Sequence, residues 1–153
     1  MRAMLIVALS LWAGFAAADV TARPGWVVME TSKPYDQLVK DVLKAVKANK
    51  MGVVTQAGPT GAAKARGITI PGNRVIGVFN NTFAVRILAL STAAMIEAPV
   101  RLYVTETQSG ATLSYKTPSL VFAPYMEESD PDLGVAASEL DVIFKTIADA
   151  AAG

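Results

Sequence analysis

Residues 100–117 read VRLYVTETQSGATLSYKT and carry the strongest structural signal in the chain. The first half alternates apolar with polar side chains, as a strand with one buried face does, and the second half alternates in the same way. Ser109-Gly110 lies between the two halves and marks a tight turn. The stretch therefore predicts a β-hairpin with strands Val100–Thr107 and Ala111–Thr117.

Three further strands are predicted upstream of this hairpin, from short runs that are rich in β-branched and aromatic residues. They are Gly25–Thr31 (GWVVMET), Met51–Ala57 (MGVVTQA) and Arg74–Phe79 (RVIGVF). Residues 67–73 contain Pro71 and Gly72, which predict an irregular connection before the third of these strands.

Two helices are predicted in this part of the chain, one after the first strand and one after the third. Apolar residues at helical spacing indicate a helix over Tyr35–Lys50, and Ser32 is a residue that can cap it. Asn80 or Asn81 can cap a second helix, which is expected to run to about Ile96.

The rest of the chain supplies a weak helical turn, a loop and one long helix. The weak turn is expected over Ala62–Arg66, and Pro118–Glu128 has no period and is expected to be a loop. Asp130-Pro131 then opens a C-terminal helix over about residues 130–152. Because helices alternate with strands while two strands follow each other directly, the order of elements predicts an α+β fold with a largely antiparallel sheet.

The first 18 residues predict a cleavable signal peptide. Arg2 gives a positive start, an uncharged and mostly apolar run follows, and Ala16-Ala17-Ala18 offers the small residues that signal peptidases prefer. Cleavage after Ala18 would leave residues 19–153 as a single periplasmic or secreted domain, with no stable membrane insertion. The alternative is an uncleaved anchor, but a spanning helix needs about 20 apolar residues and the uncharged run from Ala3 to Ala18 has 16.

The composition excludes several kinds of chemistry. The chain has no cysteine and no histidine, so it has no thiol nucleophile, no imidazole base and no thiolate or histidine metal site. The formal net charge is +1, and the signal peptide contributes Arg2 to it. A nearly neutral domain is a poor nucleic-acid binder. We therefore expect no cofactor, no bound metal and no nucleic-acid partner.

Several stretches of the chain resemble the bacterial family called domain of unknown function 302 (DUF302). The resemblance is carried by Val53-Val54 after a glycine, by RVIGVFNN before a helix, by APVRLYVTE as a strand and by SYKTP at the end of the hairpin. It covers about residues 25–125. It implies a curved sheet with helices packed on one face, similar to the TATA-binding-protein-like architecture, and a domain that can form homodimers. It implies no established activity and no catalytic residues.

The candidate ligand site is a region that combines aromatic rings with polar groups. Tyr103 and Tyr115 are expected to share a face of the hairpin, and Asn80 and Asn81 lie at a strand-to-helix junction with free backbone N–H groups. Many ligand sites are apolar clefts with a few such polar groups. The aromatic residues expected to add surface nearby are Trp26, Phe122 and Tyr125. Alternatively, these aromatic side chains fill the core or a dimer interface.

Other candidate sites are weaker. Tyr115 and Lys116 cannot act as an acid–base pair, because neighbouring residues on a strand point to opposite faces. The acidic residues of Glu127–Asp132 lack the spacing of a calcium-binding loop. Glu97 and Arg101 are expected to form a surface ion pair.

We therefore expect an exported, non-catalytic binding or accessory domain of the bacterial envelope. Its partner would be a small molecule or another envelope protein. Two alternatives stay open. One is a small hydrolase or isomerase that uses only carboxylate, Tyr, Lys or Ser groups, and the other is a structural module that only dimerises or docks.

Overall fold

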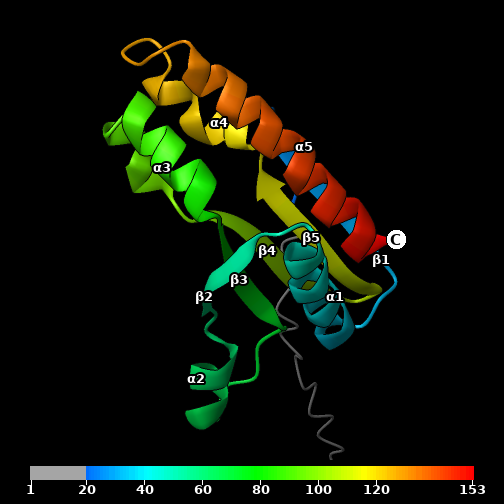
Figure 1. The fold of residues 1–153 in the computed structure, drawn as a ribbon. Coiled ribbons are helices and arrows are strands. Elements are labelled where there is room, and N and C mark those ends of the chain that lie inside the picture. Colours follow the sequence, from blue (N-terminus) through cyan, green and yellow to red (C-terminus); the bar gives the residue numbers. More distant parts are fainter. Residues whose placement is uncertain (1–19) are drawn as a thin grey trace, which may run out of the picture.

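Five strands form one antiparallel sheet in the computed structural model, which describes residues 20–153 (Figure 1). The strands are β1 (Trp26–Thr31), β2 (Gly52–Ala57), β3 (Asn73–Phe79), β4 (Val100–Thr107) and β5 (Gly110–Lys116). Their order across the sheet is β1-β5-β4-β3-β2, so the first strand pairs with the last. The α+β class is confirmed. The predicted signal peptide, residues 1–18, lies outside the described residues.

The predicted hairpin is confirmed, and its loop is one residue shorter than the predicted strand bounds imply. Thr107 pairs with Gly110, so only Gln108 and Ser109 form the loop. Gly110 has a φ of 151°, and a Cβ at this position would lie 2.3 Å from the backbone oxygen of Thr31. A residue without a side chain is required there, because the turn is pressed against the end of β1.

Two long helices cover one face of the sheet. The helices are α1 (Tyr35–Ala48), α2 (Thr60–Ala65), α3 (Asn81–Leu90), α4 (Pro118–Phe122) and α5 (Asp132–Ala152), with short 3-10 helices η1 (Ala93–Glu97) and η2 (Ala123–Tyr125). Helices α1 and α5 pack against each other and against the sheet, while α3 and α4 pack on α5 (Figure 1). Fully buried side chains at this interface include Leu38, Val42, Leu102, Leu113, Phe144 and Ile147.

The second helix ends earlier than its apolar periodicity predicts. The Asn80 side chain caps α3 by accepting hydrogen bonds from the backbone N–H groups of Thr82 and Phe83, at 2.9 and 3.2 Å. The helix ends at Leu90 and not near Ile96. Ser91 is extended and its hydroxyl accepts a hydrogen bond from the N–H of Ala94. This local bond starts a new 3-10 turn and competes with continuation of the helix.

Residues 118–128 were expected to be a loop, and that expectation is wrong. Pro118 opens α4, and Thr117 caps the helix by accepting a hydrogen bond from the N–H of Leu120. The backbone N–H and the hydroxyl of Ser119 both donate to the Asp141 carboxylate on α5, at 2.9 and 2.5 Å. This partner lies 22 residues away, so no local pattern could indicate it.

The start of α1 also differs from expectation, because Ser32 does not cap it. Pro34 precedes the first helical residue and forms no capping side-chain bond. The side-chain hydrogen bond in this turn comes from Thr31 instead, whose hydroxyl oxygen accepts a hydrogen bond from the N–H of Lys33. At the other long helix, the carboxylate of Asp130 accepts a bond from the N–H of Asp132, as a residue that opens a helix should.

Alternation along the strands gives the sheet two different faces. Leu102, Leu113 and Tyr115 point toward α1 and α5 and are buried there. The opposite face, called the cavity face below, carries Trp26, Val75, Arg101, Tyr103, Ser114 and Lys116. Because the register fixes these residues side by side, the candidate site is built mainly from strand residues.

Candidate functional site

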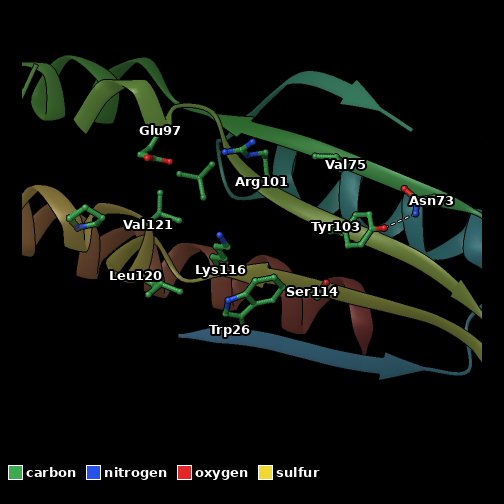
Figure 2. Close-up of a pocket in the computed structure, with 12 residues that line it drawn as sticks. Trp26, Asn73, Val75, Glu97, Arg101, Tyr103, Ser114, Lys116, Leu120 and Val121 are labelled. Carbon is green, nitrogen blue, oxygen red and sulfur yellow. Dashed lines mark hydrogen bonds between the residues drawn. The ribbon is translucent and has the colours of Figure 1, made fainter. Parts of the chain in front are cut away.

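A cavity of about 690 Å³ lies on the cavity face of the sheet (Figure 2). Its floor comes from four strands through Trp26, Val75, Tyr103 and Ser114, among others. The wall is apolar and comes from α4 and η2, through Leu120, Val121 and Pro124. This volume lies within the range of about 300–1,000 Å³ that is common for pockets of small molecules.

Two cationic side chains enter this cavity. The Arg101 guanidinium on β4 and the Lys116 ammonium on β5 both reach the space between the sheet and the apolar wall (Figure 2). Within residues 20–153, neither of them has a carboxylate at ion-pair distance. The Lys116 ammonium lies 5.4 Å from the centre of the Trp26 ring, which is a cation–π distance.

The one carboxylate that lines the cavity has a different partner from the one expected. Glu97 accepts a hydrogen bond from the hydroxyl of Tyr125 at 2.8 Å. This bond is the main reason why the pKa of Tyr125 is raised, and burial adds to it. The predicted ion pair between Glu97 and Arg101 is absent from the described residues, so the Arg101 charge stays available in the cavity.

Ser114 supplies a polar atom on the floor without a partner. The residue is 1% exposed, and its hydroxyl oxygen has no hydrogen-bond partner within residues 20–153. It pairs across the sheet with Tyr103 on β4 and with Val28 on β1. A buried hydroxyl without a partner costs free energy. The floor of the cavity therefore contains a buried hydroxyl whose hydrogen-bonding capacity is unused within residues 20–153.

The far end of the cavity is fixed by a side-chain hydrogen bond. The amide of Asn73 on β3 donates to the hydroxyl oxygen of Tyr103 at 2.5 Å, as the dashed line in Figure 2 shows. Val75 lies next to Tyr103 in the register of the sheet. This bond holds the Tyr103 ring in place at the edge of the cavity.

The comparison with protein families assigns these elements to a known domain. The family model described as domain of unknown function DUF302 matches residues 27–151. The chain belongs to this family. The match includes α5 up to residue 151 and thus extends beyond residues 25–125, on which the sequence resemblance was based.

A solved structure supports the fold of this DUF302 chain. The crystal structure of an uncharacterized conserved DUF302 protein from Bacillus stearothermophilus is similar, with a TM-score of 0.73 and 16% sequence identity. The similarity covers 83% of this chain and 98% of that chain. None of the curated proteins matches the chain significantly. The comparisons therefore establish family and fold, and the function has to be argued from the site.

The DUF302 fold does not bring the four predicted site residues together. Tyr103 lines the cavity, whereas Tyr115 is 4% exposed and packs against Phe144 on the helix side of the sheet. Burial raises the pKa of Tyr115 to about 12, with smaller contributions from nearby carboxylates. Asn80 and Asn81 lie at the start of α3, where Asn80 caps the helix and donates to the backbone oxygen of Lys50.

The expectation that Tyr103 and Tyr115 share a face is wrong, and the hairpin loop explains why. Because the loop has two residues, each odd-numbered residue of one strand pairs with an even-numbered residue of the other, as Tyr103 pairs with Ser114. Two odd-numbered residues on different strands of this hairpin must therefore lie on opposite faces. The same rule places Ser114 and Lys116 on the cavity face beside Arg101 and Tyr103.

The sequence indicated two aromatic residues of the cavity, Tyr103 and Trp26, but did not single out its polar groups. Of the three aromatic residues that were expected nearby, Trp26 lines the cavity. Phe122 is 1% exposed in the core, and Tyr125 contributes only through its bond to Glu97. The missed residues are Arg101, Ser114 and Lys116. Alternation along each hairpin strand indicates which residues share a face of that strand. The length of the loop, which decides how the faces of the two strands match, could not be read from this alternation.

Within residues 20–153, no group of three or more acidic side chains lies close enough together to hold a metal ion. No helix within residues 20–153 has the length and apolar character that crossing a membrane requires.

Proposed function

We propose that this DUF302 protein is a non-catalytic binding domain that holds a small organic molecule in the cavity, and that it works in the bacterial envelope after export. The observation that carries the proposal is the unpartnered Ser114 hydroxyl, buried on the floor of a cavity of about 690 Å³. A partly apolar ligand with one group that hydrogen-bonds would bury apolar surface and satisfy this hydroxyl.

The arrangement of groups favours binding over catalysis. A serine acts as a nucleophile when a neighbouring base accepts its proton, and Ser114 has no such neighbour in the described residues. Glu97 is the carboxylate of the cavity, and it accepts a hydrogen bond from Tyr125 and none from Ser114. The cavity therefore offers positioning groups and cations, which are the parts of a binding site.

The size of the cavity also favours binding over a purely structural role. A module that only docks or dimerises needs an exposed apolar patch and no large cavity. The apolar wall of this cavity comes from Leu120, Val121 and Pro124. In Figure 2, Val121 lies across the space from Arg101. Such a concave surface with mixed chemistry suits a small molecule better than a flat protein surface.

A neutral fluorescent probe tests the proposal. N-phenyl-1-naphthylamine brightens in apolar sites, and it would be titrated into the full chain carrying Trp12→Phe, which leaves Trp26 as the sole tryptophan. We expect saturable binding at one site, with energy transfer from Trp26. Val75→Phe fills the cavity and should weaken binding by about tenfold or more, because it removes the space that the probe occupies. Val121→Phe on the opposite wall is the second variant if the first does not fold.

Val54→Phe is the matched control. Val54 is 53% exposed on β2 and does not line the cavity, so the same change in side chain should leave probe affinity unaltered. Circular dichroism melting would verify that each variant is folded. Absence of saturable binding to the folded chain, or equal binding by Val54→Phe and both cavity-filling variants, would overturn the proposal.

A further inference from the structure

We propose that the cavity selects an amphipathic organic anion, whose single negative group lies between Arg101 and Lys116 while its apolar body lies against Trp26, Leu120 and Val121. This inference rests on the proposed binding function and names the class of ligand. The negative group is a carboxylate, a sulfonate or a phosphate ester with one charge.

The register of the sheet places the two cations opposite each other. Leu102 pairs with Tyr115, so Arg101 and Lys116 are the next two residues along β4 and β5. Arg101 also pairs with Gly77 on β3, and Lys116 pairs with Trp26 on β1. Like charges directly opposite each other on neighbouring strands destabilise a sheet. An anion between them removes this repulsion and gains two charge-assisted hydrogen bonds.

No carboxylate of the described residues already fills this role. The acidic partners of the three ion pairs within residues 20–153 are Asp41, Glu139 and Asp149, and none of these lines the cavity. Glu97 lines the cavity but accepts a hydrogen bond from Tyr125. The cavity lining therefore has two cations against one carboxylate that is already hydrogen-bonded, which favours an anion with one charge over one with several.

The residues beside Arg101 and Lys116 fix the orientation of the ligand. Trp26 pairs with Lys116 and ends the cross-strand row that contains both cations, and its ring lies 5.4 Å from the Lys116 ammonium. Ser114 and Tyr103 form the next row on the same face. An anion held by Arg101 and Lys116 thus has an aromatic face on one side and the unpartnered hydroxyl of Ser114 within the same cavity. These groups select a ligand with a charged end and an apolar body.

Two probes that differ only in one sulfonate separate the two proposals. 1-Anilinonaphthalene-8-sulfonate is N-phenyl-1-naphthylamine with a sulfonate group added. We expect the anionic probe to bind the full chain carrying Trp12→Phe about tenfold more tightly than the neutral probe, and to weaken as salt is added, because screening acts only on the charged probe.

Neutralising the cations tests their role directly. The double variant Arg101→Gln/Lys116→Gln should lose the preference for the sulfonate and keep its affinity for the neutral probe. Lys40→Gln is a control for a change in net charge, because Lys40 is exposed on α1 and does not line the cavity. It should leave both affinities unchanged.

Competition then identifies the source of the anion. 2-Naphthoate represents an aromatic acid and dodecanoate represents a lipid-derived acid, and each would be titrated against the bound sulfonate probe. Displacement by either one supports the inference, and the tighter competitor indicates the kind of apolar body. If neither competes, the inference is wrong.

The outcomes distinguish the two proposals. If the neutral probe does not bind, the binding function itself fails. If both probes bind with equal affinity and the double variant changes neither, the cavity binds apolar molecules without selecting anions, and only this inference fails.

Discussion

The side-chain amide of Asn73 on β3 donates a hydrogen bond to the hydroxyl oxygen of Tyr103 on β4, and this bond positions an aromatic ring at the edge of the cavity. If the ring contributes contact surface, Tyr103→Ala should weaken binding of N-phenyl-1-naphthylamine by about threefold to tenfold, since apolar contact is lost. Tyr103→Phe keeps the ring and should bind within about twofold of the unaltered chain, as a fluorescence titration would measure. Equal loss in both variants would show that the hydroxyl matters and the ring does not.

Asn80 is expected to stabilise α3 and to have no part in ligand binding. Its side-chain oxygen accepts bonds from the N–H groups of Thr82 and Phe83. Asn80→Ala should therefore lower the free energy of unfolding by about 1 kcal/mol, as the loss of a helix cap does. Asn80→Asp keeps the cap oxygen and should recover most of it. Urea unfolding gives the free energies, and a large drop in probe affinity for a folded Asn80→Ala chain would contradict this assignment.

Tyr115 makes the stability of the domain sensitive to high pH. Burial raises its pKa to about 12 in the folded chain, whereas an unfolded tyrosine has a pKa of about 10. Between these values the unfolded chain releases the proton and the folded chain keeps it, so the free energy of unfolding falls as pH rises from about 10 to about 12.

The phenylalanine variant isolates this contribution. Tyr115→Phe has no proton to release, so its urea midpoint should fall less between about pH 8 and about pH 11.5 than that of the unaltered chain. Both midpoints would be followed by the helical signal in far-ultraviolet circular dichroism. Parallel declines of the two proteins would assign the alkaline loss to other groups.

Lys33 connects the beginning of the domain to the end of α5. Its ammonium donates to the backbone oxygen of Ala151 at 2.7 Å and to the carboxylate of Asp41 at 3.1 Å. Lys33→Met keeps a long apolar side chain and removes both bonds, so we expect a loss of about 1 kcal/mol in the free energy of unfolding at neutral pH. A thermal melt that is unchanged would show that solvent replaces these bonds at no cost.

The ion pair between Lys33 and Asp41 predicts that the free energy of unfolding depends on pH in the acid range. The hydrogen bond from Lys33 is the main reason why the pKa of Asp41 is lowered. A lowered pKa in the folded chain means stability that is present above the unfolded pKa and is lost as pH falls through the folded one. The difference in urea midpoint between the unaltered chain and Asp41→Asn should therefore be largest at neutral pH and should shrink below about pH 4.

Much of the fold could be predicted from the sequence, because its strands and long helices have clear periodicity. The hairpin of β4 and β5 and the helices α1 and α5 follow from alternation or from helical spacing within each segment. The helix at residues 118–122 could not be predicted, since Asp141 on a distant helix holds Ser119 in place. Tertiary partners of this kind leave no local pattern.

The candidate site was harder to predict than the fold. Tyr103 was identified, but a hairpin loop one residue longer would have been needed to bring Tyr115 to the same face. Ser114 became a candidate only when its burial and the lack of a partner were known. Burial and register belong to the assembled sheet, and for this reason single segments of sequence did not reveal them.

The pairing of β1 with β5 has a consequence for how the chain reaches its native state during synthesis. The first strand has no partner until the last one has left the ribosome, and α1 waits in the same way for α5. Contacts between distant segments form slowly, because a long loop has to close first. A growing chain therefore stays without its complete sheet until β5 has been made, and β1 spends that time as an unpaired strand, open to pairing with other chains.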